Sequence, residues 1–164
     1  MGVGPAVAMR TGIGIDAHRL VVGRPLIVGG VHVPFDKGLE GHSDGDVLLH
    51  AIADALLGAA ALGDLGDHFP SERAELKDIA SMKIIAAVGQ KVREAGYRVA
   101  NIDSVIIAQR PRLKPFVAQM REGIARALEI GEDRVSVKAT STDHLGFAGR
   151  EEGIAAQAVV TLEN

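Results

Sequence analysis

Acidic and imidazole side chains recur every four residues within one strongly apolar segment. Asp46, His50 and Asp54 lie in the run DVLLHAIAD, whose other residues are all apolar. On a helix this spacing places the three side chains along one stripe. The stripe contains no cation, which is unusual for a solvated helix surface and typical of metal ligands and the groups that orient them. A capped core helix with a few hydrogen-bonded polar groups explains the pattern equally well.

A second pair of potential metal ligands lies earlier, in the run RTGIGIDAH. Asp16 and His18 are two residues apart, so in a strand both side chains point to the same face. With His50 they form a His₂Asp set, which supplies three ligands and leaves a fourth position open, as in catalytic zinc sites. The chain has no cysteine, which excludes thiolate zinc sites, iron–sulfur clusters, disulfides and thiol catalysis.

Two further segments have the composition of phosphate sites. His42 and Ser43 precede the apolar helix, whose N-terminal N–H groups attract anions, although simple capping with Ser43 as N-cap and Asp46 three positions later explains them better. A later group combines cations, hydroxyls and a carboxylate, which suits phosphate together with a metal ion, and a Ser/Thr-rich turn explains it about as well. Its members are Lys138, Thr140, Ser141, Thr142, Asp143, Gly146 and Arg150.

Hydrophobic periodicity predicts the elements that must bring these segments together. We expect strands over 10–18, 97–108, 135–140 and 154–162, a hairpin of the runs 26–28 and 31–33 around Gly29-Gly30, and helices over 44–62, 76–95 and 115–129. This order predicts an α+β fold, with a single-domain mixed β-sheet and helices packed on one face. Self-association is then expected to bury the other face.

Composition limits the class of protein. A chain of 164 residues with 47% hydrophobic and 24% charged residues is typical of one globular domain, which we place at 9–164 after an N-terminal extension at 1–8. The net charge of −3, four Phe, one Tyr and no Trp argue against nucleic-acid binding. No apolar run approaches the ~20 residues of a membrane span, and the first residues lack the pattern of a signal peptide, so we expect a cytoplasmic protein without membrane contact.

The chain closely resembles the 2-C-methyl-D-erythritol 2,4-cyclodiphosphate synthase family. The resemblance rests on the strings GIGIDAHR, GHSDGDVLLHAIADALLGAAALGDLG, IIAQRPRL and VKATSTDHLGFAGREEGIA, which occur in the family's order, and it extends from Met9 to about Leu162. It implies a phosphorus–oxygen lyase of the non-mevalonate isoprenoid pathway. Such an enzyme converts 4-diphosphocytidyl-2-C-methyl-D-erythritol 2-phosphate into the cyclic diphosphate and releases CMP.

The resemblance also implies the metals and the assembly. Zinc would be held by Asp16, His18 and His50, and a second divalent ion, Mg²⁺ or Mn²⁺, by Asp143 and the substrate phosphates. Two metals suit phosphoryl transfer, which needs alignment and charge neutralisation more than a protein nucleophile. Members form homotrimers with the sheets facing the centre, active sites between subunits and a central cavity that can hold an isoprenoid diphosphate.

Site residues follow from matching positions. His42 and Ser141 match the positions that stabilise the transition state, and Asp64 to Gly66 match the contact to the methylerythritol portion. Ala108 to Lys114 and Thr140 match the cytidine pocket, and Phe147, Arg150 and Glu152 match the surroundings of the central cavity. Asp143 stands where the family usually has Glu, Ser141 where Thr is more common, and only Phe69-Pro70 of the segment 69–73 keeps the family pattern. The substrate-binding set implied is Asp16, His18, His42, Ser43, Asp64, Leu65, Gly66, Phe69, Ala108, Gln109, Arg110, Pro111, Arg112, Leu113, Lys114, Thr140, Ser141, Thr142, Asp143, Phe147 and Arg150.

Two other functions remain open from the residues alone. A zinc phosphoesterase would use water at the open metal position and would release inorganic phosphate or a linear monophosphate. A trimeric, metal-stabilised carrier of isoprenoid diphosphates would need no catalysis, although Phe147, Arg150 and Glu152 are better explained by packing between subunits.

Overall fold

The computed structural model describes residues 7–77 and 79–164. The predicted extension at 1–8 therefore lies mostly outside the described residues, and the first strand begins at Met9. Within the described part no helix is long and apolar enough to cross a membrane.

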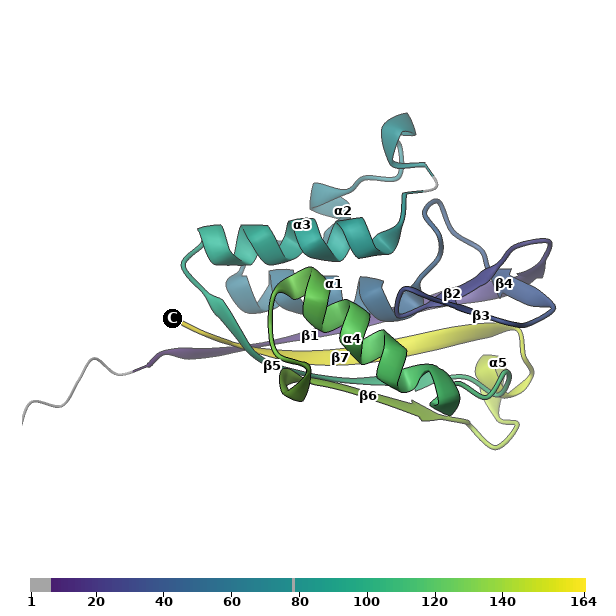
Figure 1. Cartoon of the computed structure of the whole chain (residues 1–164). Helices are drawn as coiled ribbons and strands as arrows, with labels where there is room; N and C mark the ends of the chain where they lie inside the picture. Colours follow the sequence, from purple (N-terminus) through teal and green to yellow (C-terminus); the bar gives the residue numbers. More distant parts are fainter. Residues whose placement is uncertain (1–6, 78) are drawn as a thin grey trace, which may run out of the picture.

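One mixed sheet forms the base of the molecule (Figure 1). Its strand order is β4-β1-β7-β5-β6, with all neighbours antiparallel except β5 and β6. The bounds are Met9–Val22 for β1, Lys37–Leu39 for β4, Arg98–Ile107 for β5, Val135–Thr140 for β6 and Gly153–Glu163 for β7. The two longest strands, β1 and β7, run side by side in a continuous register from Met9↔Glu163 to Arg19↔Gly153. The expected mixed α+β sheet is confirmed.

Three helices cover one side of this sheet (Figure 1). They are α1 (Val47–Ala60), α3 (Ser81–Glu94) and α4 (Val117–Leu128). Helix α1 lies on β1 and β7 and is itself covered by α3, so that most of its residues are fully buried. This double coverage explains why its sequence has no broad polar face.

The opposite side of the sheet carries exposed apolar side chains. Strand β1 alternates glycine toward α1 with isoleucine away from it, and Ile13 and Ile15 are 60% and 66% exposed. Val159, paired with Ile13 on β7, is 40% exposed. The prediction that helices cover one face is confirmed, and the bare face is more apolar than a solvated sheet surface needs to be.

The predicted hairpin is confirmed as β2 (Leu26–Val28) and β3 (Val31–Val33). Its turn residues Gly29 and Gly30 have φ of 59° and 74°, the left-handed pair that a two-residue turn of this kind requires. This hairpin forms its own two-stranded sheet beside the main one.

The sequence misplaced several boundaries. The prediction that Ser43 caps the first helix is wrong, because α1 begins at Val47 with Asp46 as N-cap, and the helix expected from residue 76 begins only at Ser81. Strand β1 continues to Val22, past the predicted end at 18. The elements not predicted are short: β4, α2 (Leu65–His68), α5 (Gly146–Gly149) and the 3₁₀ turns η1 (Ala74–Leu76), η2 (Lys114–Phe116) and η3 (Glu132–Arg134).

Candidate active site

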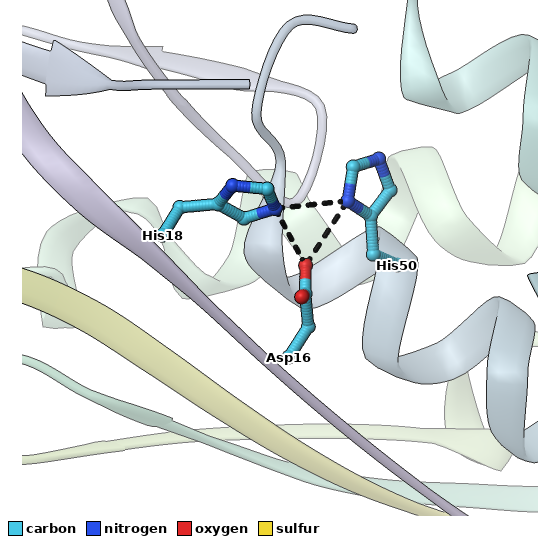
Figure 2. Close-up of side chains that lie close together, drawn as sticks. All are labelled: Asp16, His18 and His50. Carbon is cyan, nitrogen blue, oxygen red and sulfur yellow. Dashed lines mark hydrogen bonds and ion pairs between the residues drawn. The ribbon is translucent and has the colours of Figure 1, made fainter. Parts of the chain in front are cut away.

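Asp16, His18 and His50 converge on one point between β1 and α1 (Figure 2). His18 Nε2 lies 2.8 Å and His50 Nδ1 3.0 Å from the same oxygen of Asp16, and the two nitrogens are 3.3 Å apart. Asp16 and His18 extend from the side of β1 that faces α1, and His50 lies in the first turn of α1. The structure thus brings the whole predicted His₂Asp set together.

The outer ring nitrogens of both histidines have partners of their own. His18 Nδ1 lies 2.6 Å from the carbonyl oxygen of Glu40, so this nitrogen carries a proton, and Nε2 is the nitrogen that can present a lone pair to a metal ion. His50 Nε2 lies 2.9 Å from Ser81 Oγ and 3.1 Å from Ser43 Oγ. Both rings are therefore held with their inner nitrogens toward Asp16, which is how metal-bound histidines are oriented.

The three groups change one another's proton affinity. Burial alone would raise the pKa of Asp16, but hydrogen bonds from His18 and His50 outweigh it and lower that pKa well below its ordinary range. The hydrogen bond to Asp16 raises the pKa of His18 above its ordinary value of 6.5. Without a metal ion, Asp16 is therefore an ionised carboxylate, and the neighbouring His18 favours its protonated form.

The donor set fits zinc. Two imidazole nitrogens and a carboxylate oxygen, each on a separate residue, lie within 4.8 Å of one another. Ligands around a tetrahedral zinc at ~2.0–2.1 Å are about 3.3 Å apart, so the present spacing needs only a small expansion. The set needs no sulfur ligand, which agrees with the absence of cysteine from the sequence.

Asp46 has a structural role, separate from this cluster. Its fully buried carboxylate accepts hydrogen bonds from Gly29 N at 2.9 Å, Gly30 N at 2.7 Å and Leu49 N at 3.1 Å. It thereby caps α1 and fastens the β2–β3 hairpin to it. Burial, partly opposed by these N–H donors, raises the pKa of Asp46 to about 6. This carboxylate therefore occupies the N-terminus of α1, and a phosphate site at His42 and Ser43 stays a prediction for the loop before it.

The predicted methylerythritol contact lies beside the metal cluster. A cavity of about 330 Å³ is lined by Ile15, Asp16, His18, His50, Asp54, Asp64, Leu65 and Gly66. Asp54 accepts a hydrogen bond from Leu65 N at 2.9 Å and so ties α2 to α1. Asp64 begins α2 in a reciprocal capping box with Asp67. Phe69, by contrast, ends α2 and packs against the hydrophobic core.

The predicted cytidine pocket lies at the ends of β5 and β6, as a separate cavity of about 430 Å³. Its lining residues are Ala108, Gln109, Pro111, Arg112, Leu113, Lys114, Ala139, Thr140 and Ser141. Arg110 does not line it, since its guanidinium pairs with Glu151 at 2.9 Å. Six residues of the predicted segment 108–114 are thus gathered around one cavity.

The second predicted metal ligand stands apart from the first three. Asp143 lies in an exposed loop after β6, where its Oδ1 accepts a hydrogen bond from Ser141 Oγ at 3.3 Å. His144 N donates to Gln109 Oε1 at 3.0 Å and so joins this loop to the cytidine cavity. Thr142 Oγ1 closes the turn on the carbonyl of Leu145. Within one chain, the loop that carries Asp143 contacts the cavity at the ends of β5 and β6, and Asp143 is not part of the His₂Asp cluster.

The remaining predicted residues lie outside the two cavities described above. His42 is exposed in the loop before α1. Phe147 lies beside His18 in a cavity of about 320 Å³ that Ala17, Arg19, Glu152 and Gly153 complete. Arg150 is engaged by Glu152, with Nε and Oε1 2.9 Å apart.

Sequence reasoning missed Asp44 and Ser81, which lie behind His50. Asp44 lies between Ser43 and Asp46, the two residues of the predicted capping pattern, and that pattern gives Asp44 no role. Ser81 begins a helix more than one turn later than periodicity placed it. No local pattern singles out this side chain, because the N-cap of the helix is Ala80 and not Ser81.

The comparisons agree on one kind of protein. A model of the YgbB family matches residues 9–163. A relative from Salinibacter ruber, named 2-C-methyl-D-erythritol 2,4-cyclodiphosphate synthase, is 59% identical over 95% of this chain and 99% of its own length. Among solved structures, the bifunctional IspDF from Campylobacter jejuni is 44% identical with a TM-score of 0.93, over 97% of this chain and 43% of that longer chain. A CDP complex of IspF from Plasmodium falciparum is 29% identical with a TM-score of 0.83, over 94% and 96%.

Proposed function

The chain belongs to the YgbB family, and from this membership and the His₂Asp cluster we infer that it is a 2-C-methyl-D-erythritol 2,4-cyclodiphosphate synthase. It cyclises 4-diphosphocytidyl-2-C-methyl-D-erythritol 2-phosphate and releases CMP, a lyase reaction of the non-mevalonate isoprenoid pathway. An oxygen of the 2-phosphate forms a bond to the β-phosphorus, and the bond from that phosphorus to the CMP oxygen breaks. The observation that carries this conclusion is the convergence of Asp16, His18 and His50 in a chain of this family.

We propose that Asp16, His18 and His50 hold zinc, with a substrate phosphate oxygen as the fourth ligand. Zinc there would supply a Lewis acid that neutralises charge on the diphosphate. The protein's own part is to orient two imidazoles through Glu40 and Ser81 and to present one carboxylate, so that the phosphate meets a rigid set of groups. Asp64, Leu65 and Gly66, which line the same cavity, would position the methylerythritol portion.

The cytidine portion is proposed to bind in the cavity of Ala108–Lys114 and Thr140. Support comes from the cavity's volume and from the CDP complex of a relative. His42 and Ser141 would donate hydrogen bonds to the phosphates as charge develops, and Thr142 and Asp143 would contact them directly. Asp143 would also hold the second divalent ion, Mg²⁺ or Mn²⁺, together with the phosphates.

We propose a homotrimer with the bare sheet faces toward its centre. Within one chain, the metal cluster and the proposed cytidine cavity are too far apart to form one site. Thr140 is in line with Ile107, Ala155 and Ala17 across the sheet, so it shares their face, whereas Asp16 and His18 extend from the other. Three strand spacings, about 14 Å, also separate β1 from β6. A neighbouring subunit would bring its cytidine cavity to this chain's metal cluster.

The bare face offers the apolar surface that such an assembly buries, through Ile13, Ile15 and Val159. The cavity beside Phe147 would then lie near the trimer axis, where Phe147 and Arg150 could bind an isoprenoid diphosphate. Cytoplasmic location stays a prediction.

The reaction is tested by incubating the zinc- and magnesium-loaded protein with the diphosphocytidyl substrate and following the products by ³¹P NMR. The expected products are the cyclic diphosphate and CMP in equal amounts. Inorganic phosphate or a linear monophosphate would indicate the zinc phosphoesterase instead. Turnover that persists in His50→Ala would contradict the assigned metal cluster.

A further inference from the structure

A hydroxyl and a carboxylate lie in series behind His50, on the side away from Asp16. Ser81 Oγ is 2.9 Å from His50 Nε2, and the same hydroxyl donates a hydrogen bond to Asp44 Oδ1. Because the Ser81 proton points to Asp44, the Ser81 oxygen is left to accept the proton on His50 Nε2. The series keeps a proton on His50 Nε2, so that Nδ1, which faces Asp16 and His18, is the nitrogen available to bind a metal ion.

The Ser81 hydroxyl is held rigidly in this orientation. Its residue is fully buried, and its backbone N–H donates to the second oxygen of Asp44 at 2.9 Å. Asp44 N in turn donates to the carbonyl of Ile79 at 3.4 Å. Since Ala80 at the N-cap of α3 has no polar side chain, Asp44 also provides the carboxylate at the start of this helix.

Ser43 gives a comparison within the same structure. Its hydroxyl oxygen is 3.1 Å from His50 Nε2, nearly as close as that of Ser81. However, Ser43 Oγ accepts a hydrogen bond from Gly45 N at 3.3 Å, whereas Ser81 Oγ is hydrogen-bonded to a carboxylate. A charged group behind an imidazole increases its basicity as a ligand, and a neutral hydroxyl does so less.

We propose that Ser81 and Asp44 are positioning residues for the metal site, which orient His50 and strengthen its Nδ1 as a zinc ligand. This role rests on the proposed zinc site. It links metal affinity to the start of α3, a helix that contributes no ligand to the described His₂Asp cluster.

The test compares Ser81→Ala with Ser43→Ala in the full chain. Ser81→Ala removes the hydroxyl behind His50 but keeps the backbone N–H that bonds Asp44, so the start of α3 is preserved. Zinc affinity is measured by competition with a chromophoric chelator, and the visible spectrum of the cobalt-substituted protein reports ligand geometry. Urea unfolding of the metal-free variants measures folding separately. Asp44→Asn, which keeps an oxygen for the Ser81 N–H without the charge, is the second variant.

We expect Ser81→Ala to weaken zinc binding by roughly 10–100-fold and to alter the cobalt spectrum, with metal-free stability unchanged. Asp44→Asn should weaken binding in the same direction, and Ser43→Ala by less than about threefold on the same scale. If the zinc affinity of Ser81→Ala stays within about threefold of the wild-type affinity, the proposed role is wrong. The role is also wrong if the lost zinc affinity is fully explained by a lower stability of the metal-free variant. A wild-type chain that binds no zinc would overturn the proposed zinc site itself.

Discussion

The backbone of α1 at Ala51 lies directly against β1 at Gly14. A Cβ added to Gly14 would stand 2.0 Å from the carbonyl oxygen of Ala51, and one added to Gly12 would stand 2.0 Å from that of Ala55. Because Asp16 and His18 lie on β1 and His50 precedes Ala51 on α1, this close contact sets the separation of the metal ligands.

We therefore expect Gly14→Ala to push α1 away from β1, to destabilise the protein by about 1–3 kcal/mol and to weaken zinc binding. The matched control is Gly58→Ala on the same helix, where an added Cβ meets nothing within 4 Å and should stabilise by about 0.5–1 kcal/mol. Urea unfolding and zinc titration of both variants check this. Wild-type zinc affinity in Gly14→Ala would show that the helix does not set the ligand spacing.

His50→Ala is expected to lose zinc and nearly all activity, because two remaining ligands cannot hold the ion against water. His32→Ala should keep one zinc per subunit, since His32 is exposed on β3, in the separate hairpin sheet. The same holds for His68, which bonds the carbonyl of Leu62, and for His144 in the loop after β6. Elemental analysis of the purified, folded variants decides this, and zinc loss in His32→Ala would mean a different ligand set.

Zinc affinity should increase as the pH rises through the pKa of His18, because binding must displace the proton that Asp16 favours there. The stability of the metal-free protein should change in the opposite direction. A raised folded-state pKa contributes stability that is complete below the ordinary 6.5 and is lost above the folded value. The lowered pKa of Asp16 contributes stability above its ordinary 3.8 that is lost only in acid.

Unfolding curves and chelator titrations across this range measure both trends. His18→Ala is the control for the stability of the metal-free protein and should lack the part of the pH dependence that comes from His18. Zinc affinity that stays constant from pH 6 to 8 would contradict the proton displacement.

Asp46→Ala should lose about 3 kcal/mol or more of stability, because three backbone N–H groups lose a buried acceptor. Folded protein should still bind one zinc, since Asp46 does not contact the His₂Asp cluster through its side chain. Chemical denaturation with zinc analysis separates the two effects. Unchanged stability would mean that the hairpin and α1 do not depend on this carboxylate.

Ile13→Lys should break the proposed trimer, because it places an ammonium group in the apolar face that subunits would share. Val22→Lys is the matched control: Val22 is 80% exposed but lies at the end of β1 on the side of the buried Leu20. Light scattering at micromolar concentration gives the masses. A trimeric Ile13→Lys, or a wild-type chain with the mass of one subunit, would refute the assembly.

The ligand set could be predicted because it depends on local periodicity. A two-residue spacing on a strand and one histidine on an apolar helix predict that Asp16, His18 and His50 form one set, and the family resemblance favours this over a capped core helix. The strand at 135–140 and the Gly29-Gly30 turn follow from equally local preferences. The start of α1 could not be read in the same way. Ser43 and Asp46 are both residues that commonly cap helices. The structure uses Asp46 because its carboxylate also accepts hydrogen bonds from the N–H groups of Gly29 and Gly30, which are distant in the sequence.

Long-range partners explain the other omissions. Asp44 and Ser81 are adjacent only after α3 has packed over α1, and no spacing rule connects them. Arg110 matches the family's cytidine segment, but its guanidinium forms a salt bridge with Glu151, which is distant in the sequence. Side-chain direction at such positions is set by tertiary contacts, which local patterns do not contain.

The pairing of β1 with β7 also has a consequence for how the chain folds during synthesis. The strand that carries Asp16 and His18 is synthesised more than 130 residues before Gly153, where the neighbouring strand β7 begins. Until β7 has been synthesised, β1 lacks the partner along which it runs for most of its length, and α1 lacks one of the two strands on which it lies. Contacts of such high sequence separation slow folding, so the metal-binding half of the site is expected to form only after β7 has been synthesised.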